Sequence, residues 1–168
     1  TGLSLYIDAG FHEFRSSNVV TKNMSQKETQ EASIGVVLVT HADYGPSLIR
    51  AAEFILGPQD NCETVSVDGS KPVDETVENL KEAVARSDKG KGVLVLTDMF
   101  GGTPTNLSLS LLGSGQLEVL TGVNLPMLLK VLGDRHSTLG KLAGEAKEAG
   151  CQGIVVAGEL LRSKVKER

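Results

Sequence analysis

The chain has few cysteines and no surplus of positive charge, and each shortage excludes a class of protein. Its two cysteines, Cys62 and Cys151, lie in no Cys-x-x-Cys or Cys/His spacing. The sequence therefore indicates neither a disulfide framework nor a zinc site, and we expect no metal and no cofactor. A formal net charge of −4 and an isoelectric point near 5.4 disfavour nucleic acid as a partner, because phosphate binding normally requires clustered lysine and arginine.

Long hydrophobic runs are also missing. No apolar stretch of the sequence reaches the roughly 18 residues of a membrane span, and no segment has the pattern of a secretory signal. We therefore expect a cytoplasmic protein. A chain of 168 residues, with 40% hydrophobic and 23% charged residues, has the size and composition of one globular domain with a real core.

The two ends of the chain differ in composition from its middle. Residues 1–32 include a polar, linker-like stretch, and we expect an atypical N-terminal arm or linker there. Two interpretations of the part before Met24 stay open: an added or upstream-read segment, or an arm that packs on a neighbour. We place the folded domain at residues 33–161 and a charged tail at residues 162–168.

From Ser33 onward, apolar runs alternate with segments of helical spacing. The predicted strands are Ile34–Thr40, Glu63–Val67, Gly92–Thr97, Leu117–Thr121 and Gly153–Ala157. The predicted helices are Pro46–Leu56, Val73–Ser87, Pro104–Leu112, Leu125–Leu132 and Ser137–Ala149, with Gly150 as the cap of the last one. This alternation predicts an α/β fold, a three-layer sandwich with a mainly parallel sheet, whose post-strand loops gather at one edge.

A glycine turn follows one of the most apolar strands. Asp98 stands at the carboxyl tip of the strand that ends at Thr97, and Gly101-Gly102-Thr103 leads into a helix that begins with proline. Such a turn exposes backbone N–H groups that can hold an anion, while the aspartate can orient a base. The sequence therefore predicts an anion site at this edge of the sheet.

A histidine stands at a second strand tip. His41 follows the apolar run Ile34–Thr40, and two carboxyl edges of one parallel sheet can meet across its crevice. A large share of imidazole is unprotonated at neutral pH, and a carboxylate on one ring nitrogen leaves the other nitrogen free as a nucleophile. Asp98 is the candidate for that carboxylate.

Several common catalytic motifs are missing from the sequence. There is no G-x-S-x-G elbow for a serine hydrolase, no Walker lysine for a nucleoside triphosphate, and no G-x-G-x-x-G fingerprint for a dinucleotide. What remains is a nucleophilic histidine beside a cradle of phosphate size. We place Thr40, Phe100 and Asn124 in the loops near this site. Asn124 has a second interpretation, as the cap of the following helix.

Three segments together resemble the signature loops of a known family. They are Ile34–His41, Asp98–Asn106 and Gly122–Leu128. In this order and spacing they resemble the mannose-family enzyme IIA component of the bacterial phosphoenolpyruvate-dependent sugar phosphotransferase system. One departure is the segment Asp43–Pro46, where small apolar residues are expected.

The resemblance implies roles for individual residues. His41 would take a phosphoryl group on Nε2 from phospho-HPr and pass it to a histidine of an enzyme IIB. Asp98 would bind His41 by a hydrogen bond, and Thr103 with the backbone of Gly101 and Gly102 would hold the phosphoryl oxygens. A membrane permease would be reached only through these partners.

The resemblance also implies a homodimer in which the last strand, near Gly153–Ala157, is exchanged and runs antiparallel to four parallel strands. Two alternatives to the transport role stay open. The protein could be a regulatory phosphoprotein that binds target proteins, or a phosphocarrier for dihydroxyacetone kinase.

Overall fold

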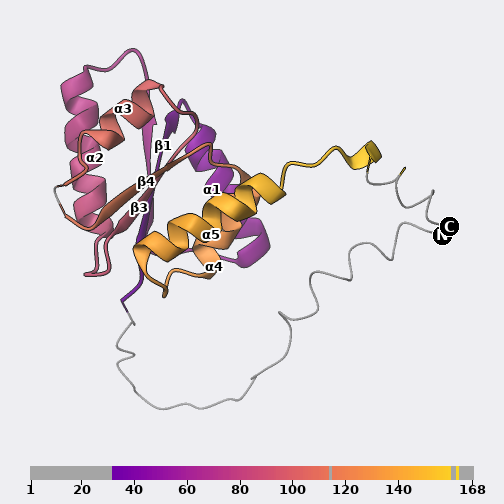
Figure 1. Ribbon diagram of the computed structural model, residues 1–168. Helices are drawn as coiled ribbons and strands as arrows, with labels where there is room; N and C mark the ends of the chain where they lie inside the picture. Colours follow the sequence, from indigo (N-terminus) through magenta and orange to yellow (C-terminus); the bar gives the residue numbers. More distant parts are fainter. Residues whose placement is uncertain (1–31, 114, 160–161, 163–168) are drawn as a thin grey trace. The chain divides into compact units, whose positions relative to one another are not determined.

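The computed structural model describes residues 32–113, 115–159 and 162. Apart from residues 32 and 162, the expected N-terminal arm and charged tail lie outside the described residues. The described residues form a four-stranded sheet in the order β2-β1-β3-β4. Every neighbouring pair of strands is parallel, and helices cover both faces of the sheet (Figure 1).

Most of the predicted elements are formed. The strands are β1 (Gly35–His41), β2 (Cys62–Val67), β3 (Val93–Thr97) and β4 (Leu117–Thr121). The helices are α1 (Tyr44–Leu56), α2 (Val73–Ser87), α3 (Thr103–Leu109), α4 (Leu125–Gly133) and α5 (Leu139–Gln152). The α/β fold is confirmed. Helix α3 ends earlier than predicted, because the hydrogen bonds of Leu111 and Leu112 reach back three residues instead of four.

The strands separate two apolar layers. Along β1, Val36 and Leu38 face one cluster that includes residues of α1, α4 and α5. The alternate residues Val37 and Val39 face a second cluster, which includes residues of α2. Both clusters need apolar side chains from the same strand, so β1 is a continuous hydrophobic run. Figure 1 accordingly shows α1, α4 and α5 on one side of the sheet and α2 and α3 on the other.

The carboxyl ends of the two central strands form a switch point of the sheet, where a crevice is expected. β1 pairs with β3 in a register that sets Val39 opposite Thr97. After β1 the chain turns to α1 on one face of the sheet, and after β3 it turns to α3 on the other face (Figure 1). Such a switch point leaves an opening between the two loops. His41 and Asp98 are the first residues on either side of it.

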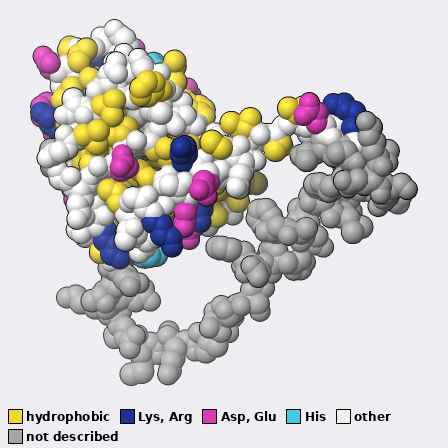
Figure 2. Space-filling view, in the orientation of Figure 1, with side chains coloured by type: hydrophobic (Ala, Val, Ile, Leu, Met, Phe, Trp, Pro, Cys, Tyr) yellow, Lys and Arg dark blue, Asp and Glu magenta, His cyan; other side chains and the backbone are white. Residues whose placement is uncertain are grey.

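The chain does not form the predicted strand Gly153–Ala157 by itself. Helix α5 continues to Gln152, Gly153 ends it, and residues 154–156 have no regular structure. Gly150, the predicted cap, is inside α5, where a Cβ atom would come within 2.7 Å of Cε of Met127. The glycine therefore serves close helix packing instead of helix termination. Ile154, Val155 and Val156 are exposed, and Figure 2 shows apolar side chains along this segment.

Gly35 gives a test of how tightly the first strand packs. A Cβ atom on this residue would lie 2.3 Å from the backbone oxygen of Ser87, at the end of α2. Because backbone must move to relieve that overlap, we expect Gly35→Ala to lower the free energy of unfolding by about 1–3 kcal/mol. Urea unfolding measures this change.

The matched control is Gly144→Ala. Gly144 is exposed within α5, and among the described residues no atom outside the adjoining backbone of the helix and its two neighbours lies within 4 Å of a Cβ placed there. Alanine should raise stability at this position by about 0.5–1 kcal/mol, because it restricts the unfolded chain. Equal urea midpoints for Gly35→Ala and the unmodified protein would contradict the close packing of β1 on α2.

Candidate active site at the carboxyl edge of the sheet

His41 and Asp98 meet across the crevice between β1 and β3. Nδ1 of His41 lies 2.7 Å from Oδ2 of Asp98, and the backbone N–H of His41 donates to the same oxygen at 2.9 Å. The other carboxylate oxygen, Oδ1, accepts a hydrogen bond from the backbone N–H of Met99 at 2.9 Å. Both oxygens of Asp98 are therefore held, and the imidazole ring is held with them.

These contacts determine which nitrogen of His41 carries the proton. An ionised carboxylate only accepts hydrogen bonds, so Nδ1 must be the protonated nitrogen. In the neutral ring, Nε2 then keeps its lone pair. The side chain of His41 is 47% exposed and that of Asp98 is 15% exposed. An external group can therefore reach the histidine while the aspartate behind it is shielded.

Asp98 is ionised over the neutral range of pH. Its partial burial raises the pKa of the carboxyl group, but hydrogen bonds from the backbone and the ring of His41 and from Met99 lower it. The hydrogen bonds outweigh the burial, so the pKa of Asp98 lies below its ordinary value. A carboxylate in this state can stabilise an imidazolium ring.

The glycine turn lies next to the ring of His41. A Cβ atom on Gly102 would come within 3.1 Å of Cε1 of His41, the carbon between the two ring nitrogens. The neighbouring Gly101 has φ of 79°, which favours glycine. In the described part of the chain, no hydrogen bond engages the backbone N–H groups of Gly101, Gly102 or Thr103. This turn can therefore present donors to an anion near Nε2.

Thr40 supports the loop that carries His41. Its side chain is fully buried and its Oγ1 accepts a hydrogen bond from the backbone N–H of Gly45 at 2.8 Å. The bond satisfies one free donor in the first turn of α1. Between them, Ala42 has φ of 49°, an unusual value for a residue with a side chain. The chain therefore turns sharply from β1 into α1 directly after the histidine.

Other predicted residues lie in different surroundings. Asn124 caps α4, since its Oδ1 accepts from the backbone N–H of Met127 at 3.0 Å, and its Nδ2 donates to the carbonyl of Gly150 at 3.1 Å. The capping interpretation of Asn124 is therefore confirmed, and its place in a loop near the site stays a prediction. Phe100 is 77% exposed at the turn, and Thr103 is exposed in the first turn of α3.

The sequence analysis missed three residues that connect the loops. The hydroxyl of Tyr44 donates to the carbonyl of Val123 at 3.0 Å and joins the first loop to the loop after β4. Thr97 and Thr105 form a buried hydroxyl pair beneath the glycine turn. A threonine that ends an apolar strand was the available signal for Thr97. Tyr44 lies in the segment Asp43–Pro46, whose departure from the family pattern was the available signal. No local pattern distinguished Thr105.

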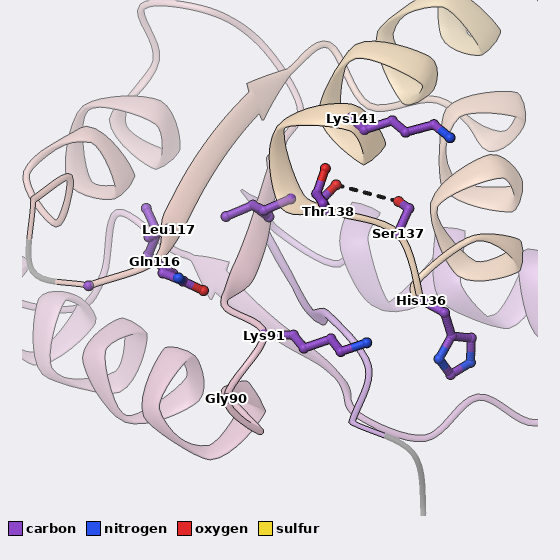
Figure 3. A pocket seen from close by; sticks show the side chains of 10 residues that line it. Gly90, Lys91, Gln116, Leu117, His136, Ser137, Thr138 and Lys141 are labelled. Carbon is purple, nitrogen blue, oxygen red and sulfur yellow. Dashed lines mark hydrogen bonds between the residues drawn. The ribbon is translucent and has the colours of Figure 1, made fainter.

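A cavity of about 690 Å³ lies at the opposite edge of the sheet, where β3 and β4 begin. Lys91, His136 and Lys141 are among the residues that line it, and their side chains do not converge on a common point (Figure 3). Nowhere in the described residues are three or more His, Cys, Asp or Glu side chains grouped to hold a metal ion. Among the described helices, none is long and apolar enough to cross a membrane.

Known proteins share this sequence pattern. A family model described as the fructose IIA component of the phosphotransferase system (PTS) matches residues 35–147. The PTS fructose-specific EIIA component of Bacillus subtilis (strain 168) is 33% identical over 135 residues, which are 79% of this chain and 92% of that protein. The PTS mannose-specific EIIAB component of Escherichia coli (strain K12) is 32% identical over 125 residues, 73% of this chain. The match covers 39% of that longer relative.

Solved structures share the fold. The EIIA component from Streptococcus agalactiae superposes with a TM-score of 0.69 at 26% identity, over 75% of this chain and 98% of that one. The mannose/sorbose-specific IIA subunit from Enterococcus faecalis superposes with a TM-score of 0.68 at 23% identity, over 74% and 94% of the two chains. The sequence match over most of the domain establishes the relationship, and the chain belongs to the mannose/fructose EIIA family of the phosphotransferase system.

Proposed function

We propose that this protein is a phosphoryl carrier of a sugar phosphotransferase system. In this role His41 accepts a phosphoryl group from phospho-HPr and passes it to a histidine of an enzyme IIB. The observation that carries the proposal is the 2.7 Å contact between Nδ1 of His41 and Oδ2 of Asp98. It leaves Nε2 as the free nucleophile, on an exposed ring beside a glycine turn.

The transfer step uses the lone pair of Nε2. This nitrogen attacks the phosphorus atom of the donor phosphohistidine, a P–N bond forms to His41, and the donor's P–N bond breaks. The departing imidazole of the donor keeps the electron pair. The proton on Nδ1 stays in its hydrogen bond to Asp98, whose negative charge stabilises the cationic ring during the transfer. Delivery to enzyme IIB follows the same steps with His41 as the donor. The histidine of enzyme IIB attacks the phosphorus atom, the P–N bond to His41 breaks, and Nε2 of His41 keeps the electron pair.

The glycine turn would hold the phosphoryl oxygens. The backbone N–H groups of Gly101 and Gly102, together with Thr103, lie at the start of α3, beside the histidine ring. Oriented donors of this kind stabilise charge on a transferring phosphoryl group, and positioning is most of what such a reaction requires. We assign these three residues to phosphate binding.

The surface around His41 suits protein partners. The side chains of Tyr44, Met99 and Phe100 are 42%, 56% and 77% exposed. Exposed apolar and aromatic side chains at a site are typical of protein-docking surfaces. We assign HPr and enzyme IIB to this surface in turn, and a membrane permease would be reached only through them.

We also propose a homodimer with exchanged C-terminal segments. Ile154, Val155 and Val156 are 76%, 59% and 63% exposed, and such an apolar stretch favours association. The edge strand β4 pairs within the described residues only with β3, so it has a free side for an added strand. The C-terminal segment of a second copy could pair with this side of β4. The pairing would cover the apolar side chains of that segment.

The assignment of the nucleophile predicts where phosphate is incorporated. Incubation with phosphoenolpyruvate, enzyme I and HPr should place acid-labile phosphate on the unmodified protein and none on His41→Ala. The control is His136→Ala, which changes a histidine at the far edge of the sheet and should leave labelling intact. Acid-labile phosphate on His41→Ala would refute the assignment.

The orienting role of Asp98 predicts a kinetic defect without unfolding. In Asp98→Asn the charge is lost while the size of the side chain is kept. We expect phosphoryl transfer to slow by about 10²-fold or more, because the ring loses its preferred tautomer and the stabilisation of its cation. Rapid-quench kinetics measure the rate, and circular dichroism checks the fold. Unchanged kinetics would show that Asp98 supports its turn and does not orient the ring of His41.

The exchanged segment predicts a dependence of oligomeric state on residues 154–156. A chain that ends at Gly153 should be monomeric at micromolar concentration by light scattering. A chain that ends at Glu159 keeps the apolar segment and should stay dimeric, which makes it the matched control. If the shorter chain folds and is still a dimer, the dimer does not depend on exchange of this segment.

A further inference from the structure

A buried pair of hydroxyl groups lies beneath the turn that carries Asp98. Oγ1 of Thr105 lies 2.6 Å from the carbonyl oxygen of Met99 and 2.7 Å from Oγ1 of Thr97. The side chains are almost completely buried, since Thr97 is 0% and Thr105 is 1% exposed. Short hydrogen bonds in a buried position are expensive to break, because their partners cannot turn to water.

The direction of each hydrogen bond follows from the acceptors. The carbonyl of Met99 can only accept, so the hydroxyl of Thr105 must donate its single proton to it. Thr105 then has only lone pairs to offer Thr97. The hydroxyl of Thr97 therefore donates to Thr105, and the two threonines form a chain of defined orientation that ends on the turn.

The hydroxyl of Thr105 is bound to the residues on both sides of Asp98. Thr97 is the residue before Asp98 and Met99 is the residue after it, and both are bound by the one hydroxyl of Thr105 from α3. Met99 also donates its backbone N–H to Oδ1 of Asp98 at 2.9 Å. The backbone N–H of Met99 is thus bound to Asp98, and the carbonyl of Met99 is bound to Thr105.

We propose that Thr105, oriented by Thr97, is a positioning residue for phosphoryl transfer. It holds the turn so that Oδ2 of Asp98 faces Nδ1 of His41, and through that contact it maintains the lone pair on Nε2. The kinetic part of this inference rests on the proposed carrier function. The structural part, the tautomer of His41, does not depend on it.

The experiment compares three substitutions in α3. Thr105→Val keeps the shape of the side chain and removes the hydroxyl, whereas Thr105→Ser keeps the hydroxyl. The matched control is Ser108→Ala, because Ser108 is also buried and its Oγ donates at 2.7 Å to the carbonyl of Pro104, within α3 and not to Asp98 or either of its neighbours. Thr97→Val is a second test, which keeps the bond from Thr105 to Met99 and removes the donor behind it.

Two readouts separate positioning from stability. The ¹⁵N chemical shifts of the His41 ring at mildly alkaline pH report which nitrogen carries the proton. We expect Nδ1–H in the unmodified protein, in Thr105→Ser and in Ser108→Ala, and a mixture with Nε2–H in Thr105→Val. The rate of phosphoryl transfer from phospho-HPr should fall about 10-fold or more in Thr105→Val, fall less in Thr97→Val, and stay near its original value in the other two variants.

A double-mutant cycle tests whether Thr105 acts through the aspartate. Thr105→Val added to Asp98→Asn should slow transfer little beyond Asp98→Asn alone, because the contact that Thr105 maintains is already altered.

The outcomes distinguish this inference from the carrier function. If the unmodified protein acquires no phosphate, the carrier function is wrong, and the ring tautomer alone decides the role of Thr105. The inference is overturned if Thr105→Val matches Ser108→Ala in the tautomer, or if its rate effect adds fully to that of Asp98→Asn. Should Thr105→Val fail to fold, Thr105→Ala, which also lacks the hydroxyl, takes its place, and an unaltered tautomer in that variant would overturn the inference.

Discussion

The parallel pairing of β1 with β3 is the constraint on which the site depends. Its register sets Val39 beside Thr97, and the chain leaves the two strands toward opposite faces of the sheet (Figure 1). This arrangement creates the crevice and brings His41 to Asp98. It also places the glycine turn beside the ring of His41. A slip of one residue would turn the alternate side chains of β3 to the wrong apolar layer, so the two hydrophobic clusters also protect the geometry of the site.

Within this frame, a small set of hydrogen bonds defines the chemistry. Asp98 receives the backbone N–H of His41, the ring N–H of His41 and the backbone N–H of Met99. These donors outweigh the burial that would otherwise raise the pKa of its carboxyl group. The histidine can therefore be exposed to a partner and still have one defined tautomer. Beneath this turn, the hydroxyl groups of Thr97 and Thr105 form a further buried hydrogen bond.

The elements that sequence analysis predicted well are those whose pattern is local. Strands β1 and β3 are apolar runs with turn residues at their ends, and Leu117–Thr121 and Val73–Ser87 match β4 and α2 residue for residue. The prediction for Gly150 was wrong because packing decides there: the glycine lies against Met127 inside α5 instead of ending the helix. Among the described residues the apolar run Gly153–Ala157 is not paired as a strand. A strand needs a neighbour to pair with, so its exchange with a second copy stays a prediction.

The sequence by itself determined which chemical groups stand at the strand tips, because a histidine or an aspartate after an apolar run is a local fact. It also determined the alternation of strands and helices, which depends on periodicity within each segment. Only the tertiary structure decided that Nδ1 of His41 faces Asp98, that the amide of Asn124 reaches Gly150 in α5, and that Thr105 reaches Met99. These contacts join segments that are separated along the chain, or depend on a turn whose shape no residue specifies alone, so they exist only when the sheet has formed.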